Sequence, residues 1–268
     1  MEHFWYEILT FCQITTQKIS HQLMADVGKL SPTLKEDGSL VTQADRWADQ
    51  AIREAIAAKF PEHGVLTEET AHIFPNTDWC WVIDPIDGTT NFTRGIPLWA
   101  ISFGLLYQGI PVFGFVYLPQ VQQSFYGYWY GKSGLTGPIG AYLNGEPIHT
   151  SSDTPSKSHL FNLCARSIKI LRQPFPCKIR MLGIASYNIL LVSSGAALGG
   201  VEATPKIWDI AAVWVILQAA GGSLISLKDE AIFPLEIGRN YATYSLPCLA
   251  VSRSELIPLF KPLVDCIV

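Results

Sequence analysis

The sequence predicts an α+β fold, with an antiparallel sheet in the first half of the chain and alternating helices and strands in the second half. Near the N-terminus, two segments have the apolar spacing of amphipathic helices. Residues 95–131 contain no Lys, Arg, Asp or Glu, and prolines divide them into pieces of strand length, which indicates a buried sheet rather than a membrane span. The pattern changes after about residue 152, where we expect a lobe boundary.

The N-terminal elements are predicted from periodicity and from residues that interrupt it. Residues 2–29 and 45–60 have the pattern of amphipathic helices, and Pro61 ends the second one. Between them, SPTLKEDGSLVTQAD has the proline and glycine punctuation of a loop.

Strands dominate the centre of the chain. GVLTEET (64–70) and DWCWVID (78–84) each indicate a strand that ends in acidic residues. Residues 99–119 predict two strands and residues 122–130 a third, which together give an antiparallel meander. Asn144-Gly145 then indicates a tight turn.

Size and composition exclude several classes of protein. At 268 residues, the chain slightly exceeds the usual size of a single core, so we expect one compact unit of two lobes, residues 1–152 and 153–268. The net charge of -4 provides no basic surface for nucleic acid or an anionic membrane, and we expect neither as a partner. The six cysteines have no metal-site spacing and predict reduced thiols in a cytoplasmic protein.

The segment WVIDPIDGTTNF (81–92) places two carboxylates, Asp84 and Asp87, three residues apart at the end of an apolar run. Like charges this close raise each other's pKa, and a divalent cation removes that cost. Pro85 restricts the local backbone, so both side chains and the Ile86 carbonyl can converge on one point. Oxygen donors without His or Cys suit Mg²⁺.

The residues that follow suit an anion. Gly88 permits close backbone approach, and the amides of Gly88, Thr89 and Thr90 are expected at a helix N-terminus, which favours negative charge. Metal-binding carboxylates beside such amides describe a phosphate site.

Acids in two other segments have the positions needed to complete this site. Glu68 and Glu69 end a strand, and Asp209 begins the apolar helix of KIWDIAA. Each also has an ordinary interpretation, as surface acids for the glutamates and as a helix N-cap for Asp209.

These motifs resemble those of the inositol monophosphatase family, within the larger group of Mg²⁺-dependent, lithium-sensitive phosphatases. The resemblance covers most of the chain and rests on LTEET, WVIDPIDGTTNF and IWDIAA in that order, together with GIASYN and Glu202. It implies a layered αβαβα sandwich of the type also found in fructose-1,6-bisphosphatase, with an antiparallel N-terminal sheet and a mixed C-terminal sheet. A homodimer and two or three Mg²⁺ ions per site are implied as well.

Metal ligands follow from the same resemblance. Glu68, Asp84 and the Ile86 carbonyl would bind a first ion, and Asp84, Asp87 and Asp209 a second, while Glu68 also reaches a weaker third. The implied reaction is in-line displacement by water, without a phosphoenzyme.

The resemblance also implies catalytic and substrate-binding residues. Glu68, together with a hydrogen-bonded pair formed by Thr89 and Asp45, would orient and deprotonate the attacking water. Glu202 matches a carboxylate that contacts a substrate hydroxyl, and Ile184 stands where the family often has Ser or Thr, so one polar contact is expected to be missing. The implied substrate-binding residues are Asp87, Gly88, Thr89, Gly183, Ile184, Ala185 and Glu202.

Three further residues are weaker candidates for the site. Lys35 matches a lysine near the third metal and is equally consistent with a solvated loop residue, and Glu69 adjoins Glu68. Lys206 stands where the family commonly has an uncharged residue or His. It either adds positive charge beside the leaving group or points its ammonium into water.

The expected function is a Mg²⁺-dependent phosphomonoesterase that acts on inositol 1-phosphate or a similar small polyol phosphate. Histidinol-phosphate phosphatase and fructose-1,6-bisphosphatase are alternatives that the central motif barely separates. A non-catalytic protein that binds a phosphorylated metabolite is an alternative from a different class, and the complete set of acidic ligands argues against it.

Overall fold

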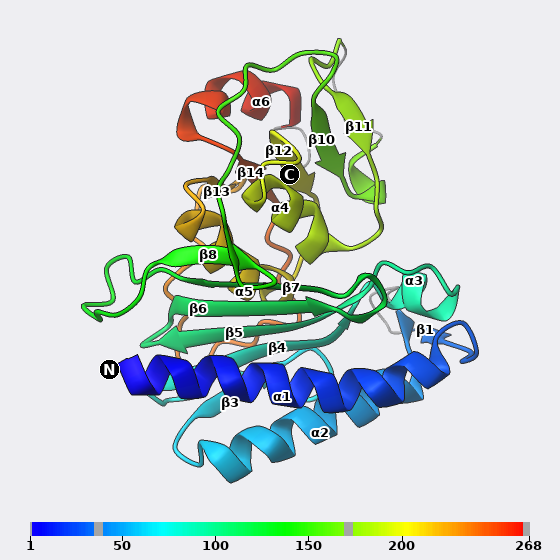
Figure 1. Cartoon of the computed structure of the whole chain (residues 1–268), viewed down its shortest axis with the longest axis vertical. Helices are drawn as coiled ribbons and strands as arrows, with labels where there is room; N and C mark the ends of the chain where they lie inside the picture. Colours follow the sequence, from blue (N-terminus) through cyan, green and yellow to red (C-terminus); the bar gives the residue numbers. More distant parts are fainter. Residues whose placement is uncertain (1, 35–39, 169–173, 265–268) are drawn as a thin grey trace.

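Helices and sheets alternate in layers in the computed structural model, which describes residues 2–34, 40–168 and 174–264 (Figure 1). Two helices, α1 (Glu2–Asp26) and α2 (Gln43–Lys59), cover one face of a seven-stranded sheet. Helices α4 (Ala185–Ser193) and α5 (Ile207–Ala219) lie between this sheet and a five-stranded one, whose outer face packs against α6 (Ile257–Val264). The αβαβα sandwich is therefore confirmed.

The seven-stranded sheet has the order β3-β4-β5-β6-β7-β8-β9. Its strands are β3 (Gly64–Thr67), β4 (Trp79–Asp87), β5 (Ala100–Tyr107), β6 (Ile110–Leu118), β7 (Gln123–Tyr128), β8 (Gly140–Leu143) and β9 (Glu146–Ile148). The meander from β4 to β9 is antiparallel, as expected, and Asn144 and Gly145 form the last turn with positive φ. The edge pair β3–β4 is parallel, because the intervening residues return the chain to the same end of the sheet.

The five-stranded sheet is mixed and has the order β11-β10-β12-β14-β13. Its strands are β10 (Leu160–Leu163), β11 (Lys178–Arg180), β12 (Gly199–Glu202), β13 (Ser223–Ser226) and β14 (Cys248–Val251). Strand β10 runs parallel to β11 and β12, whereas β14 runs antiparallel to β12 and β13. The two sheets draw their strands from different halves of the chain, while the lobe boundary at residue 152 stays a prediction.

Short elements complete the fold. Strands β1 (Thr33–Leu34) and β2 (Leu40–Val41) form a small antiparallel pair, and α3 (Thr89–Thr93) follows the central motif. The 3-10 helices are η1 (Pro119–Val121), η2 (Ala165–Ser167) and η3 (Ser254–Leu256). No helix in the described part of the chain combines the length and apolarity that a membrane crossing needs. The described cysteines, Cys12, Cys80, Cys164, Cys177 and Cys248, are free thiols.

Helix α2 begins two residues before the expected start because its N-terminus is capped. The hydroxyl of Thr42 accepts from the amides of Ala44 and Asp45, at 3.1 and 3.4 Å, and Oδ2 of Asp45 accepts from the Thr42 amide at 2.7 Å. This reciprocal arrangement is a capping box. It fixes the position of Asp45, whose other carboxylate oxygen faces the candidate site described below.

Two glycines in the seven-stranded sheet let helix α5 approach very closely. A Cβ added at Gly104 would lie 2.9 Å from the Cβ of Ala211, and one added at Gly114 would overlap the carbonyl oxygen of Ala212. Both alanines are buried in α5. The absence of side chains at these strand positions therefore allows the helix that carries Asp209 to pack close against the sheet.

We expect Gly114→Ala to lower the free energy of unfolding by about 1 to 3 kcal/mol, because the helix must move away from the sheet. Urea unfolding of the purified protein would measure the change. Gly200→Ala is the matched control, since its Cβ would lie no closer than 3.4 Å to another heavy atom in a comparably central strand. Equal stability losses in the two variants would contradict the packing argument.

Candidate active site

A β-bulge at the end of strand β4 brings the two aspartates of the central motif to one side. Asp84 pairs with Ser102 and Asp87 with Ala100, so two residues of β4 stand opposite one residue of β5. In a regular strand, residues three apart face opposite sides, and the extra residue reverses that. The amide of Ile86 donates to Oδ1 of Asp84 at 3.0 Å, which fixes the bent segment.

Three carboxylates from two distant segments meet at this bulge. One oxygen each of Asp84, Asp87 and Asp209 can be chosen so that all three lie within 4.8 Å of one another. Glu68 lines the same hollow, which has a volume of about 780 Å³. The structure thus assembles the acidic cluster that the sequence predicts, from the ends of β3 and β4 and the start of α5.

The cluster is electrostatically costly without a cation. Burial, followed by the charges of Glu68, Asp87 and Asp209, raises the pKa of Asp84 well above its usual value. Burial, followed by the charges of Asp87 and Glu68, does the same to the pKa of Asp209. A divalent cation among these carboxylates would relieve the repulsion.

Two carboxylates of the cluster are also held by backbone amides. Oδ2 of Asp209 accepts from the amide of Lys206 at 2.7 Å, which makes Lys206 the N-cap residue and Asp209 the third residue of α5. The interpretation of Asp209 as an N-cap is therefore wrong. Oδ2 of Asp87 accepts from the amide of Ser186 at 2.8 Å, so the motif is tied to the start of α4. Both bonds leave the second carboxylate oxygen available for a metal ion.

The hydrogen bond that the resemblance implies between Thr89 and Asp45 is present. Oγ1 of Thr89 lies 3.1 Å from Oδ1 of Asp45 and 3.1 Å from the carbonyl oxygen of Ile86. Gly88, with φ of +89°, lets the chain turn from β4 into α3. A Cβ there would lie 3.2 Å from the carbonyl oxygen of Leu98. The turn therefore favours glycine for two reasons, the positive φ and the lack of space for a side chain.

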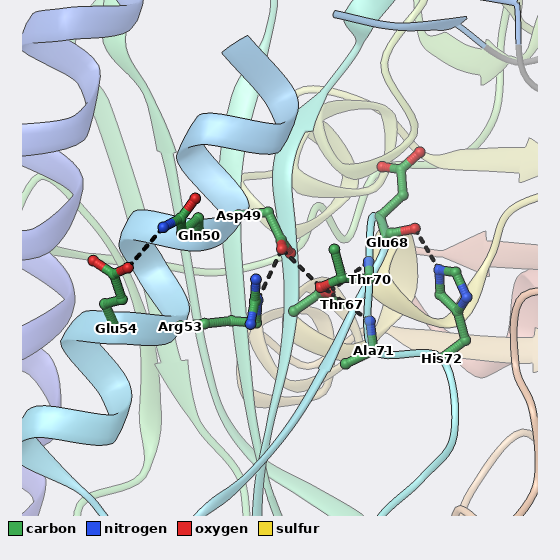
Figure 2. Close-up of polar contacts among 9 residues, drawn as sticks. All are labelled: Asp49, Gln50, Arg53, Glu54, Thr67, Glu68, Thr70, Ala71 and His72. Carbon is green, nitrogen blue, oxygen red and sulfur yellow. Dashed lines mark hydrogen bonds and ion pairs between the residues drawn. The ribbon is translucent and has the colours of Figure 1, made fainter. Parts of the chain in front are cut away.

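Glu68 is held by a network outside the cluster (Figure 2). Its carbonyl oxygen lies 2.8 Å from Nε2 of His72, and the preceding Thr67 accepts from the amides of Thr70 and Ala71 at 3.3 and 3.2 Å. The hydroxyl of Thr70 donates at 2.8 Å to Oδ2 of Asp49. These bonds fix the turn on which Glu68 lies.

Asp49 anchors that turn to helix α2. It is fully buried, and its Oδ2 also accepts from Nε of Arg53 at 2.9 Å, an ion pair within one helical turn (Figure 2). Asp49 does not line the hollow. We therefore infer that it positions Glu68 without contact with a substrate.

The predicted substrate residues divide between two hollows: Asp87, Gly88 and Thr89 line the first, and the other four line a second, smaller one of about 340 Å³. It contains Gly183, Ile184, Ala185 and Glu202. Oε1 of Glu202 accepts from Nδ2 of Asn188 at 2.7 Å, and burial is the main cause that raises the pKa of Glu202 to about 7. Ile184 is buried and presents an apolar surface here, as expected.

The three weaker candidates have different outcomes. Lys206 lines the first hollow, and its ammonium donates to the carbonyl oxygen of Ala242 at 2.6 Å, so it does not simply point into water. Glu69 lines neither hollow. Lys35 lies outside the described residues.

Several residues of the site were not singled out from the sequence. Nδ2 of Asn91 donates to the carbonyl oxygens of Leu98 and Leu182, both at 2.8 Å, and so joins α3 to the segment that precedes α4. Ser186 and Asn188 belong to GIASYN, and their bonds to Asp87 and Glu202 could have been suspected from that motif. Arg166 and Asp49 belong to no recognisable motif, and only the fold brings them near the site.

Comparison with known proteins agrees with this geometry. The family model described as "Inositol monophosphatase family" matches residues 5–257. The chain belongs to the inositol monophosphatase family. Its members are metal-dependent phosphatases, and the oxygen-only cluster of Asp84, Asp87 and Asp209 fits a metal ion.

Individual relatives have several names. The chain is 33% identical over 251 residues to an inositol-1-monophosphatase of Synechocystis sp., with 89% of this chain and 84% of that protein covered. It is 31% identical to a histidinol-phosphatase of Mycobacterium tuberculosis, covering 74% of this chain and 78% of that protein. Among solved structures, the Thermotoga maritima IMPase has a TM-score of 0.79 at 27% identity, with 98% of this chain and all of that chain covered.

The acidic cluster leads to a prediction about stability. Because folding raises the pKa of Asp84 above its usual 3.8, the folded apoprotein binds more protons than the unfolded chain, and this contribution to stability decreases as the pH rises above that value. Without divalent cations at about pH 8, we expect Asp84→Asn to be more stable than the wild type by on the order of 1 kcal/mol.

Thermal unfolding at about pH 5 and about pH 8, with and without Mg²⁺, would test this expectation. The advantage of Asp84→Asn should shrink toward the acidic pH, and Mg²⁺ should raise the melting temperature of the wild type more than that of the variant. Asp229→Asn, which alters an exposed acid elsewhere, is the matched control. An advantage that does not change with pH would contradict the electrostatic origin.

The anchoring role of Asp49 leads to a prediction about activity. Asp49→Asn weakens the bonds to Arg53 and Thr70, so we expect kcat to fall about tenfold through misplacement of Glu68, with KM changed little. Asp49→Glu, which keeps the charge, should recover part of the loss. Glu54→Gln is the control, since Glu54 accepts from Gln50 on an exposed part of the same helix (Figure 2). Equal loss in Asp49→Glu and Asp49→Asn would oppose the positioning role.

Proposed function

We propose that this protein is a Mg²⁺-dependent phosphomonoesterase that hydrolyses a small polyol phosphate, inositol 1-phosphate or a similar ester. The observation that carries the proposal is the convergence of Asp84, Asp87 and Asp209 within 4.8 Å, in the hollow that Glu68 also lines. Carboxylate and carbonyl oxygens are the ligands that Mg²⁺ prefers. A cluster this costly to bury is typical of a functional site rather than of a structural one.

The metal ligands proposed are those that the family resemblance implies. Glu68, Asp84 and the Ile86 carbonyl would hold one ion, and Asp84, Asp87 and Asp209 another. When bound, divalent cations supply positive charge that stabilises the phosphoryl oxygens and the leaving oxygen and lowers the pKa of water. The chain contributes the positions of its oxygen atoms, because the bulge in β4 and the start of α5 fix three of these carboxylates.

Thr89 would orient the attacking water and Glu68 would deprotonate it. The Thr89 hydroxyl faces two acceptors, Asp45 and the Ile86 carbonyl, so its proton is directed toward them and its oxygen lone pairs are free to accept from water. Glu68 would accept the other proton. The water oxygen bonds to phosphorus as the ester P–O bond breaks, and the departing oxygen takes a proton from a solvent water molecule, which gives the free alcohol and inorganic phosphate. The proton accepted by Glu68 returns to solvent, which restores the carboxylate.

Substrate binding would divide between the two hollows. The backbone amides of Gly88 and Thr89 are proposed to bind phosphoryl oxygens, aided by the turn that Gly88 permits. The alcohol part would lie in the second hollow, where the Glu202 carboxylate could accept from a substrate hydroxyl and Ile184 would contact its carbon atoms. Homodimer formation, lithium inhibition and a cytoplasmic location belong to the same proposal and rest on the resemblance and on the free cysteines.

Two related phosphatase activities are second candidates, because similar proteins are named for them. One relative is a histidinol-phosphatase of Mycobacterium tuberculosis, and a 31% identical protein of Aquifex aeolicus is named fructose-1,6-bisphosphatase/inositol-1-monophosphatase. A non-catalytic phosphometabolite-binding protein is the alternative from another class. The complete acidic cluster supports the enzyme over the binder.

A phosphate-release assay with Mg²⁺ on inositol 1-phosphate, histidinol phosphate, fructose 1,6-bisphosphate and adenosine 3′,5′-bisphosphate would test the proposed function. We expect turnover of at least one of the first three esters, and a loss of about a hundredfold or more in Asp84→Asn, since the variant removes a charged oxygen from the cluster. Asp229→Asn should behave as the wild type. Absence of turnover on every ester would support the binding protein instead.

A further inference from the structure

The two hollows of the site meet at a positively charged edge. Arg166, Thr90, Thr204 and Asp209 line both of them, and Lys206 lines the larger one. Among the described residues around the two hollows, Arg166 and Lys206 alone carry a permanent positive charge. They lie where a phosphate held by the acidic cluster would continue into the rest of its substrate.

Both cations are oriented by neutral groups. Nη1 of Arg166 donates to the hydroxyl of Thr204, and the ammonium of Lys206 donates to the Ala242 carbonyl at 2.6 Å. Neither side chain forms an ion pair with a carboxylate within residues 2–34, 40–168 and 174–264. No ion pair within these ranges therefore compensates either charge, and each side chain has further N–H groups that can donate to an anion.

The opposite wall of the smaller hollow does not compensate these charges strongly. Glu202 is buried, accepts from Asn188, and has a pKa of about 7, so part of its population is neutral near neutral pH. A neutral or partly neutral acid attracts a cationic substrate group weakly and repels an anionic one weakly. With Asp209 assigned to a metal ion in the proposed function, Arg166 in both hollows and Lys206 in the larger one are the charges that a substrate group would meet where the hollows join.

We propose that Arg166, assisted by Lys206, forms a subsite for a second anionic group of the substrate. This inference rests on the proposed function and narrows it: within the class of small polyol phosphates, the preferred substrate carries a further phosphate or carboxylate on its alcohol part. An amino alcohol such as histidinol phosphate is disfavoured, because its ammonium would approach two positive charges. The planar guanidinium of Arg166 suits two-point binding of a phosphate or carboxylate.

Substrate selectivity tests the subsite. With Mg²⁺ and the full-length chain, the ratio of kcat/KM for fructose 1,6-bisphosphate to that for inositol 1-phosphate should fall about tenfold or more in Arg166→Gln, mostly through KM. The ratio should fall less in Arg166→Lys, because lysine keeps the positive charge but lacks the planar guanidinium that binds an anion at two points. Arg180→Gln is the matched control: Arg180 is exposed, donates to the Ile179 carbonyl and lines neither hollow, so its ratio should equal that of the wild type.

An unchanged ratio in Arg166→Gln, or an equal fall in Arg180→Gln, would overturn the subsite while leaving the phosphatase intact. If no ester is hydrolysed, the proposed function fails instead, and the subsite is decided by calorimetry with the same two ligands and Mg²⁺. In that case, weaker binding of fructose 1,6-bisphosphate to Arg166→Gln than to the wild type supports the subsite. Equal affinities reject it.

Discussion

Mutual repulsion among carboxylates that are buried or half-buried is the constraint on which the rest of this structure depends. Asp84, Asp87 and Asp209 lie within 4.8 Å of one another, and neighbouring acids and burial raise the pKa of Asp84 and of Asp209. Such a cluster persists only if packing elsewhere holds its members in place or a cation neutralises them. The same repulsion makes the cluster suited to hold a metal ion, on which the phosphatases of this family depend.

The fold holds the acids by main-chain features rather than by flexible side chains. A bulge sets Asp84 and Asp87 on one side of β4, while backbone amides from α4 and α5 bind single oxygens of Asp87 and Asp209. Helix α5 reaches its position because Gly104 and Gly114 leave space in the sheet beneath it. A sheet and two helices are thus all required for one small cluster, to which strand β4 and helix α5 contribute from the two halves of the chain.

Negative and positive side chains lie in different parts of the site. Carboxylates dominate the part where metal and phosphoryl group are proposed to bind, whereas Arg166 and Lys206 lie at the junction with the smaller hollow. Relatives of comparable similarity are named for inositol, histidinol and fructose phosphates, so the central motif alone does not distinguish leaving groups. In the proposed binding mode the leaving group lies in the second hollow, so residues there would select among neutral, cationic and anionic leaving groups.

The sequence by itself determined the helices at the N-terminus, the antiparallel meander, the αβαβα arrangement through its family resemblance, and the acids Glu68, Asp84, Asp87 and Asp209. These features are readable because periodicity and motif spacing are local properties of the chain. Tertiary structure alone decided that β3 pairs in parallel with β4, that Lys206 bonds to the Ala242 carbonyl, and that Asp49 and Arg166 lie near the site. Those contacts join segments that are distant in sequence, and no local pattern encodes which ones the packing of sheets and helices brings together.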